Sequence, residues 1–425
     1  MKKFCIFLSL LALQLPAQTL TECRDRFNRY LNFRGSLTHQ VRFDEKSITL
    51  LSHAKPELVL YEEELPALSA FLQSASLKAQ EALLRQKGTK RLKPSTLDSL
   101  LKISSQPSFA YNAGAPLPLK GYRIALDPGH SAITLAEAQV EQKFLYFAKP
   151  DNSGDSVRIF ESFLTFNTAS ILKKMLEEKG ATVMLTRPAA DQTSFGCTLS
   201  EWMRKDKKRC LDSLNLAGSL STSKYQQLLK ATDYNVFWEF FRDFDLAHRA
   251  SLVNEFAPDV TLIIHYNVDE KNVPWNKYTS KNFTMAFIGG AFTADNLSRT
   301  EGRVNFVRLL VSPQLNLSER LASETVGQFK KHLAIAVARS TDADYLKNNC
   351  LSTSSPGVFC RNLALCRKIN SPLVYGESLY QDNIRESALL MGTELDFNGL
   401  STNARLQQVA TSYYEGLLAF LKSRP

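Results

Sequence analysis

Short apolar runs alternate with amphipathic segments from Gly121 to about residue 421, and this alternation restricts the possible fold more than any other feature. The apolar runs have the length of strands, and the segments between them carry apolar residues at helical spacing. Strands that alternate with helices predict an α/β fold, in which a mostly parallel open sheet has helices on both faces. We expect strands at 122–126, 182–186, 260–264, 286–288, 358–360 and 373–375, and helices at 164–179, 245–256, 318–337 and 404–421.

A smaller region precedes the alternating part, which we place at 119–425. Residues 18–118 are interpreted as an N-terminal accessory region and a linker. Leu, Ala, Glu and Lys recur at helical spacing over 21–32 and 62–87, which predicts a mainly helical region. Proline and glycine residues over 104–119 are typical of a linker.

Two stretches interrupt the alternation and are interpreted as insertions between core elements, near 131–160 and 188–244. The second contains Trp202, a basic run at 205–209 and an aromatic cluster of Trp238, Phe240 and Phe241. Aromatic and basic side chains together can bind a substrate or a partner, but such a mixture more often belongs to a packed helical subdomain. Either insertion could also cover a cleft and require a protein activator to displace it.

The first residues predict export. Lys2 and Lys3 form a basic start, an apolar run follows over 4–15, and Ala17 supplies a small residue. This pattern is typical of a secretory signal peptide over 1–17, and an uncleaved anchor is the alternative. The apolar run is shorter than the roughly 20 residues that a membrane span needs, and no later segment resembles a transmembrane helix. The mature chain is therefore expected in the periplasm or in association with the cell wall.

Charge and cysteine content bear on partners and compartment. The net charge of +10 favours an anionic polymer such as a cell wall, or a membrane face, although it could equally be ordinary surface charge. Export argues against nucleic acid as a partner. Six cysteines lie outside the predicted signal peptide, and an even number permits disulfides whose pairing the sequence does not reveal. Cys360 and Cys366 are not spaced like a zinc knuckle, so a cysteine-based metal site is not expected.

Polar side chains follow three of the expected strands. His130 ends one strand in the sequence Asp-Pro-Gly-His, His265 ends another, and Glu377 follows a third. A single strand-end histidine is more often a structural residue. Ligands of open α/β sheets, however, bind outside the carboxyl ends of the strands, so these three side chains are expected to meet at one edge. The proline and glycine before His130 favour a tight turn that directs the imidazole outward.

The order of the motifs resembles the zinc-dependent N-acetylmuramoyl-L-alanine amidases, which cleave peptidoglycan between the sugar lactyl group and the first residue of the stem peptide. The resemblance extends over about 121–421. It comprises a strand ending in Asp-Pro-Gly-His at 124–130, a Glu that opens a helix at 161–169, Gly-x-x-Val-x-Leu-Thr-Arg at 180–187, Arg249 and Asn254 on one helix, a strand into His-x-Asn at 263–267, and a Pro-led strand into Glu at 372–377.

The resemblance implies that His130, Glu161 and His265 bind one zinc ion and that Glu377 is the catalytic residue. Two imidazoles and one carboxylate leave the fourth position of zinc open for water, as a catalytic site requires. Zinc lowers the pKa of that water towards about 7 and polarises the scissile carbonyl. Glu377 would take a proton from the water and pass it to the leaving amine. Arg249 and Arg361 are candidates to orient groups, although ordinary structural roles are more common for such residues.

The chain departs from the family pattern after the first histidine. Ser131 and Ala132 stand where the family usually has a second glycine-rich stretch, and the gap to Glu161 is long. Glu137 and Glu141 are therefore rival ligands. Glu161 is preferred because it alone is followed by the helix and the Leu-Thr-Arg strand.

A second departure concerns the catalytic segment. Gly376 precedes Glu377 where the family often has an apolar residue, and Glu386 is the nearest rival base. Two other functions therefore remain beside the peptidoglycan amidase: a catalytically inactive or regulatory cell-wall-binding protein of the same fold, and a zinc amidase or peptidase that acts on another substrate.

Overall fold

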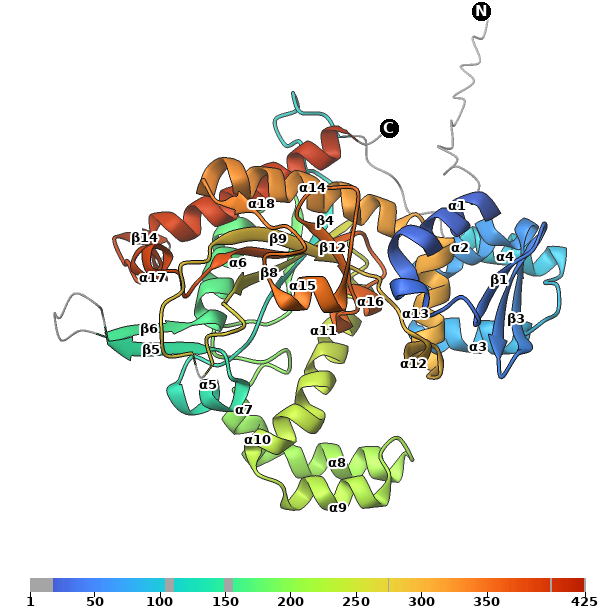
Figure 1. The fold of residues 1–425 in the computed structure, drawn as a ribbon, viewed down its shortest axis with the longest axis horizontal. Coiled ribbons are helices and arrows are strands. Elements are labelled where there is room, and N and C mark those ends of the chain that lie inside the picture. Colours follow the sequence, from blue (N-terminus) through green and yellow to red (C-terminus); the bar gives the residue numbers. More distant parts are fainter. Residues whose placement is uncertain (1–17, 104–110, 149–155, 274, 398–399, 424–425) are drawn as a thin grey trace, which may run out of the picture.

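The computed structural model describes residues 18–103, 111–148, 156–273, 275–397 and 400–423 of the chain. The signal peptide predicted at 1–17 lies outside the described residues. Figure 1 shows a central sheet with helices on both sides, and a smaller region beside it that contains the N-terminal elements.

The central sheet has eight strands, and its order is β11-β12-β9-β13-β8-β4-β7, with β10 beside β9. β8 pairs in parallel with β4 and with β13, β4 pairs in parallel with β7, and β13 pairs antiparallel with β9. The prediction of a mostly parallel open sheet is confirmed. The strands are β4 Arg123–Pro128, β7 Thr182–Leu185, β8 Val260–Asn267, β9 Phe283–Ile288, β10 Ala336–Val337, β11 Cys350–Ser352, β12 Val358–Arg361 and β13 Leu373–Tyr380.

Helices cover both faces of the sheet, so β8 at its centre is buried along its whole length, as is usual in parallel sheets. Leu262 and Ile264 of β8 lie in the larger core together with residues of α6, α14 and α18, whereas Ile263 between them lies in a smaller core with α11 and α16. This division follows from the period of two along a strand. The covering helices are α6 Glu161–Glu177, α14 Gln314–Leu333, α18 Ala404–Lys422, α11 Arg242–Phe256 and α16 Ala364–Lys368.

Two strands are longer than the sequence predicted. β8 continues to Asn267 and β13 to Tyr380, so His265 and Glu377 lie inside hydrogen-bonded strands. The apolar pattern stops at these polar residues, but the backbone pairing does not depend on side-chain polarity and continues past them.

The N-terminal region is mainly helical, as predicted, but it also contains a three-stranded antiparallel sheet that the sequence did not indicate. The helix expected over 62–87 is broken at Ala75, and Ser76 caps the second helix. The division of the chain at 118 and 119 stays a prediction. The elements are α1 Leu20–Arg26, η1 Phe27–Leu31, η2 Phe33–Gly35, β1 Val41–Phe43, β2 Ser47–Ser52, β3 Lys55–Tyr61, η3 Glu62–Glu64, α2 Leu65–Ser74, α3 Leu77–Lys87 and α4 Pro94–Ile103.

The two stretches interpreted as insertions form separate features. Residues 131–160 contain a short helix and a β-hairpin, and residues 188–244 contain a helical arm that extends away from the sheet (Figure 1). Trp202, Phe237 and Phe241 are buried in the core of this arm. The elements are α5 Leu135–Glu141, β5 Phe144–Ala148 and β6 Ser156–Phe160, followed by α7 Leu199–Glu201, η4 Trp202–Asp206, α8 Lys207–Leu216, α9 Thr222–Lys230, α10 Asp233–Val236 and η5 Phe237–Phe241.

The remaining helices and strands lie in the second half of the chain. One of them, α13 (Thr300–Val311), contacts the N-terminal region, where the guanidinium of Arg26 donates to the carbonyl of Leu310 at 2.8 Å. These elements are α12 Ala294–Leu297, α13 Thr300–Val311, α15 Asp344–Asn349, α17 Ile384–Leu390, β14 Leu395–Phe397 and β15 Leu400–Thr402.

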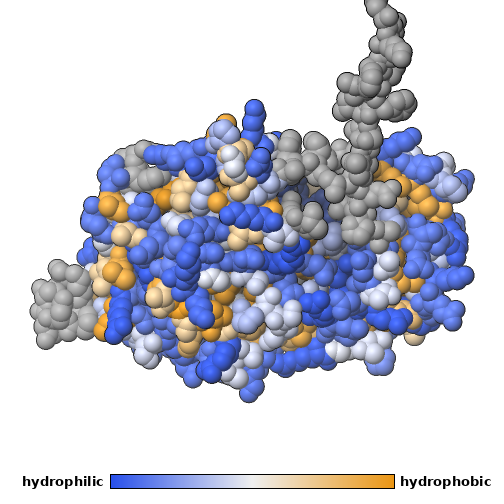
Figure 2. All heavy atoms as spheres, turned by 90° about the horizontal axis from the view of Figure 1, so that it is seen from above, coloured by the Kyte–Doolittle hydropathy of each residue, from blue (hydrophilic) through white to orange (hydrophobic). Residues whose placement is uncertain are grey.

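The face in Figure 2 is mostly hydrophilic, with hydrophobic residues in small patches. Among the described residues, no helix has both the length and the apolarity needed to cross a membrane. The six cysteines that the structure describes are all free thiols, and burial raises the pKa of Cys366 to about 12.

Gly376 has a structural role that its neighbour in α18 explains. The hydroxyl of Tyr413 donates to the carbonyls of Ile263 and Gly376, at 3.3 and 3.1 Å, so its ring lies directly against the backbone of β13. A Cβ at position 376 would overlap this ring. Only glycine leaves room for the tyrosine.

We therefore expect Gly376→Ala to lower the free energy of unfolding by about 1–3 kcal/mol through overpacking. Gly327→Ala is the matched control, because a Cβ there meets no atom within 4 Å and alanine favours the helix. Urea unfolding of the metal-free proteins measures both changes. Equal stabilities of the two variants would show that Tyr413 does not restrict position 376.

Candidate metal centre

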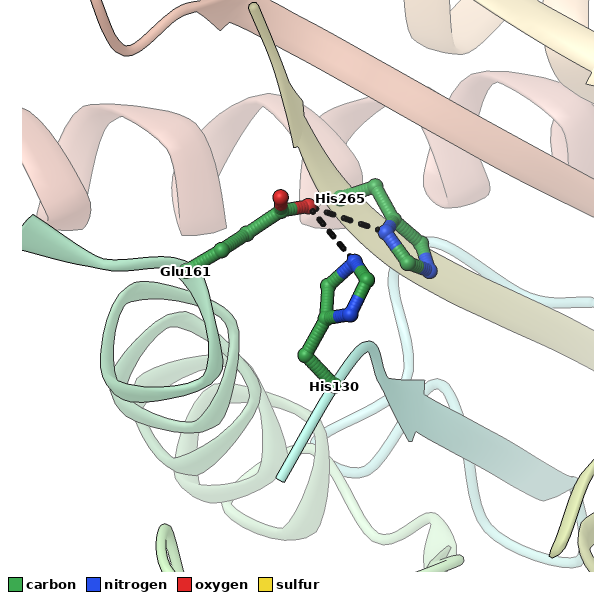
Figure 3. Close-up of side chains that lie close together, drawn as sticks. All are labelled: His130, Glu161 and His265. Atoms are coloured by element: carbon green, nitrogen blue, oxygen red, sulfur yellow. Dashed lines mark hydrogen bonds and ion pairs between the residues drawn. The ribbon is translucent and has the colours of Figure 1, made fainter. Parts of the chain in front are cut away.

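Three of the residues singled out by sequence lie together in the structure. His130 comes from the turn after β4, Glu161 is the first residue of α6, and His265 lies in β8 (Figure 3). Their possible ligand atoms all lie within 4.8 Å of one another. Oε1 of Glu161 is 3.4 Å from Nε2 of His130 and 3.0 Å from Nδ1 of His265. This is a candidate metal centre with two imidazoles and one carboxylate.

Strand pairing and a glycine place His265. Its ring stacks on that of Tyr375 from the neighbouring strand, with centroids 4.4 Å apart and an interplanar angle of 8°. On its other side, a Cβ at Gly129 in the turn after β4 would overlap the His265 ring. The imidazole is therefore held between β13 and the turn after β4, and its side chain is only 9% exposed.

Glu161 is held by the backbone and by a glutamine. Its Oε1 accepts a hydrogen bond from the amide of Tyr266 at 3.2 Å, and its Oε2 accepts one from Nε2 of Gln381 at 3.1 Å. Gln381 was not anticipated from the sequence, because nothing in the residues after β13 marks it as a neighbour of α6.

His130 has a backbone conformation that is unusual for a residue with a side chain. Its φ is +61°, in the left-handed region, and such a conformation costs about 1–3 kcal/mol. Two buried arginines hold the turn: Arg187 donates to the carbonyl of Gly129 at 3.2 Å, and Arg249 donates to that of His130 at 3.3 Å. The Leu-Thr-Arg motif therefore has a physical role, because its arginine fixes the turn that carries the first histidine.

The two rival ligands, Glu137 and Glu141, lie outside the group of His130, Glu161 and His265. Glu141 contacts the other side of the His130 ring, with Oε1 3.1 Å from Nδ1. Glu137 accepts a hydrogen bond from the amide of Ser200 at 2.8 Å. Neither joins the group formed with Glu161 and His265.

Glu377 lies beside the group. It is the direct neighbour of His265 in the register of β13 and β8, and both side chains face the α11 side of the sheet. Among the described residues, its Oε2 is buried without a hydrogen-bond partner. Burial and the nearby carboxylate of Glu161 raise the pKa of Glu377 to about 8. A carboxylate with a pKa near neutral can serve as a general base.

The other residues named from sequence have structural contacts. Glu386, the rival base, lies on α17, and its carboxylate forms an ion pair with Arg405 of α18 at 2.7 Å. Asn254 accepts from the amide of Asn370 at 2.8 Å and so ties α11 to the segment before β13. The guanidinium of Arg361 lies over the rings of Phe287 and Tyr345, at 5.1 and 5.0 Å from their centroids.

The carboxylates change the titration of the histidines. Burial alone would lower the pKa of His130, but Glu161 and Glu141 outweigh it and raise this pKa to about 9. Burial lowers the pKa of His265, and Glu161 offsets this only in part. His265 is therefore neutral at pH 7, whereas metal-free His130 is protonated.

The raised pKa of His130 predicts that the free energy of unfolding depends on pH. Histidine in an unfolded chain titrates near 6.5. A folded pKa of about 9 stabilises the fold fully below pH 6.5, and this contribution is lost as the pH rises through 9. With a chelator present, wild type should lose at most about 3 kcal/mol of unfolding free energy relative to His130→Gln between pH 6 and 9.5. Urea unfolding at both pH values tests this, and a difference that does not change with pH would contradict it.

Comparisons with known proteins agree with the sequence motifs. A family model described as N-acetylmuramoyl-L-alanine amidase matches residues 124–419. No curated protein matches the chain.

Three solved structures are among those that match. They are the CwlD amidase from Clostridioides difficile in complex with the GerS lipoprotein (15% identity, 72% of this chain and 100% of that chain, TM-score 0.38), Ami1 from Mycobacterium smegmatis (14%, 72% and 99%, 0.39), and the catalytic domain of CwlV from Bacillus (Paenibacillus) polymyxa (14%, 71% and 99%, 0.36). At these TM-scores the likeness carries no argument. The family model spans more than half of the chain, and the protein therefore belongs to the N-acetylmuramoyl-L-alanine amidases, the family of peptidoglycan hydrolases that its motifs resemble.

Proposed function

We propose that the protein is a zinc-dependent amidase that hydrolyses the bond between N-acetylmuramic acid and L-alanine of the stem peptide. Family membership supports the substrate, and the grouping of His130, Glu161 and His265 is the observation that carries the zinc dependence. Peptidoglycan lies outside the cytoplasmic membrane, so this substrate requires export to the periplasm or the cell wall. A protein activator remains a further prediction.

The donor set fits zinc. Ligand bonds of about 2.0–2.2 Å in a tetrahedral site put donor atoms roughly 3.4 Å apart. Oε1 of Glu161 lies 3.4 and 3.0 Å from the two facing imidazole nitrogens. Metal ligands must be deprotonated, so His130 would release a proton on binding, whereas His265 is already neutral. Three protein ligands leave one position open, as catalytic sites require.

Glu377 would supply the proton transfers. A bound zinc ion would lower the pKa of a water molecule towards about 7 and polarise the scissile carbonyl. Glu377 would take a proton from the attacking water and pass it to the nitrogen of the leaving amine. Oε2 of Glu377 is buried and has no hydrogen-bond partner in the described part of the chain, which leaves a lone pair available for this task. A nearby dication also favours the carboxylate form, because opposite charge lowers a carboxyl pKa.

We expect Glu377→Gln to reduce the release of stem peptides from purified peptidoglycan by about 10²–10⁴-fold, because a positioned general base contributes that much. Zinc content should stay at one ion per chain. The matched control is Glu255→Gln, an exposed glutamate on α11. Undiminished activity in Glu377→Gln would remove this residue from the mechanism.

His265→Ala tests the ligand assignment. Loss of one of three ligands should abolish tight zinc binding and activity together. Zinc content after dialysis and clearing of peptidoglycan-impregnated gels, with and without a chelator, measure both. Retained zinc in His265→Ala would contradict the ligand assignment. Gel clearing by wild type that is unchanged by the chelator would exclude zinc catalysis.

A further inference from the structure

Glu141 makes a contact that the proposed mechanism does not use. It is the last residue of α5, it is 6% exposed, and its Oε1 lies 3.1 Å from Nδ1 of His130. The other ring nitrogen of His130, Nε2, faces Glu161 at 3.4 Å. The two nitrogens of one imidazole therefore face different carboxylates on opposite sides of the ring.

We propose that Glu141 is a positioning residue that holds His130 as a metal ligand through Nε2 by accepting a hydrogen bond from Nδ1–H. The proposal rests on the zinc-dependent function proposed above. A metal-ligating histidine commonly donates its other ring N–H to a carboxylate, which fixes the tautomer and the ring orientation. In neutral imidazole only one nitrogen carries a proton, so an acceptor at Nδ1 leaves the lone pair on Nε2.

The second carboxylate oxygen of Glu141 holds the backbone that follows the histidine. Oε2 accepts hydrogen bonds from the amides of Ser131 at 3.3 Å and Ala132 at 3.1 Å. The same side chain thus binds the ring and the next two residues. This arrangement opposes relaxation of His130 from its positive φ, because a move of the backbone would break these bonds.

Helix α5 is itself held in place by the helical arm. The indole of Trp238 in η5 donates to the carbonyl of Val140, the residue before Glu141, at 3.1 Å. The amide of Ser200 at the start of α7 donates to Glu137 on the same helix, at 2.8 Å. The arm therefore contacts α5 at two points, and α5 in turn presents the carboxylate to His130.

Glu141→Gln is the variant that tests the proposal, because it preserves size and removes the charge. Its amide oxygen can replace only one carboxylate oxygen, and its NH₂ group would face an N–H donor. Competition with a chromophoric chelator should give a zinc affinity 10–100-fold weaker than that of wild type. Gln139→Ala is the control, since Gln139 is exposed on the same helix. Its zinc affinity should stay within about twofold of wild type.

A spectroscopic measurement separates positioning from general destabilisation. In ¹⁵N-histidine-labelled wild type with zinc, long-range ¹⁵N–¹H spectra should show His130 with a proton on Nδ1 and the metal on Nε2. Coordination through Nδ1 would overturn the proposal even if every Glu141 variant failed to fold. In folded Glu141→Gln, the Nδ1 proton signal should shift or exchange faster.

The outcomes distinguish the two proposals. If wild type binds no zinc, the proposed function fails. If wild type binds zinc tightly and Glu141→Gln has the same affinity and the same tautomer signals, Glu141 is not a positioning residue, and the proposed function stands.

Discussion

The parallel pairing of β8 with β4 and with β13 is the constraint on which the site depends. At one edge, the amide of Gly129 donates to the carbonyl of Ile264 at 3.0 Å, which fastens the turn of His130 to the residue before His265. At the other edge, the register places Glu377 directly beside His265. Because side chains alternate along a strand, a slip of one residue in either pairing would turn His265 or Glu377 towards the opposite core. One central strand therefore fixes both the second imidazole and the neighbouring carboxylate.

The electrostatics of this edge favour a cation. Glu161 and Glu377 are close enough that the charge of the first, together with burial, raises the pKa of the second to about 8. Two carboxylates in a buried place are unfavourable unless positive charge compensates them. His130 supplies one positive charge in the metal-free protein, since its pKa is about 9. A divalent cation supplies two positive charges and displaces the proton of His130. The two carboxylates repel each other, and their negative charge for the same reason attracts such an ion strongly.

The parts of this site that sequence could predict are those with a local signal. His130 and His265 were found from the apolar strands that they follow, whereas Glu161 came from the family resemblance, in which a Glu opens the helix at this point. The contact of Glu141 with His130 had no such signal, because it depends on how an inserted helix folds back, and the spacing only made Glu141 a rival ligand. The strands β1–β3 and the hairpin β5–β6 were missed for a related reason. Apart from the apolar β5, their short runs mix polar and apolar residues, and pairing with a neighbouring strand decides their structure.

The candidate metal centre forms only once distant parts of the chain have come together. The turn of His130 is held by Glu141 from α5, Arg187 after β7 and Arg249 from α11, and its positive φ costs about 1–3 kcal/mol. An ion that binds only the folded state stabilises it by RT ln(1 + [L]/Kd), which is about 4 kcal/mol when the free ion is 1,000 times Kd. That stabilisation exceeds the cost of the strained turn. Residues that hold the turn before the ion arrives increase the affinity further, because less of the binding free energy is then spent on ordering His130.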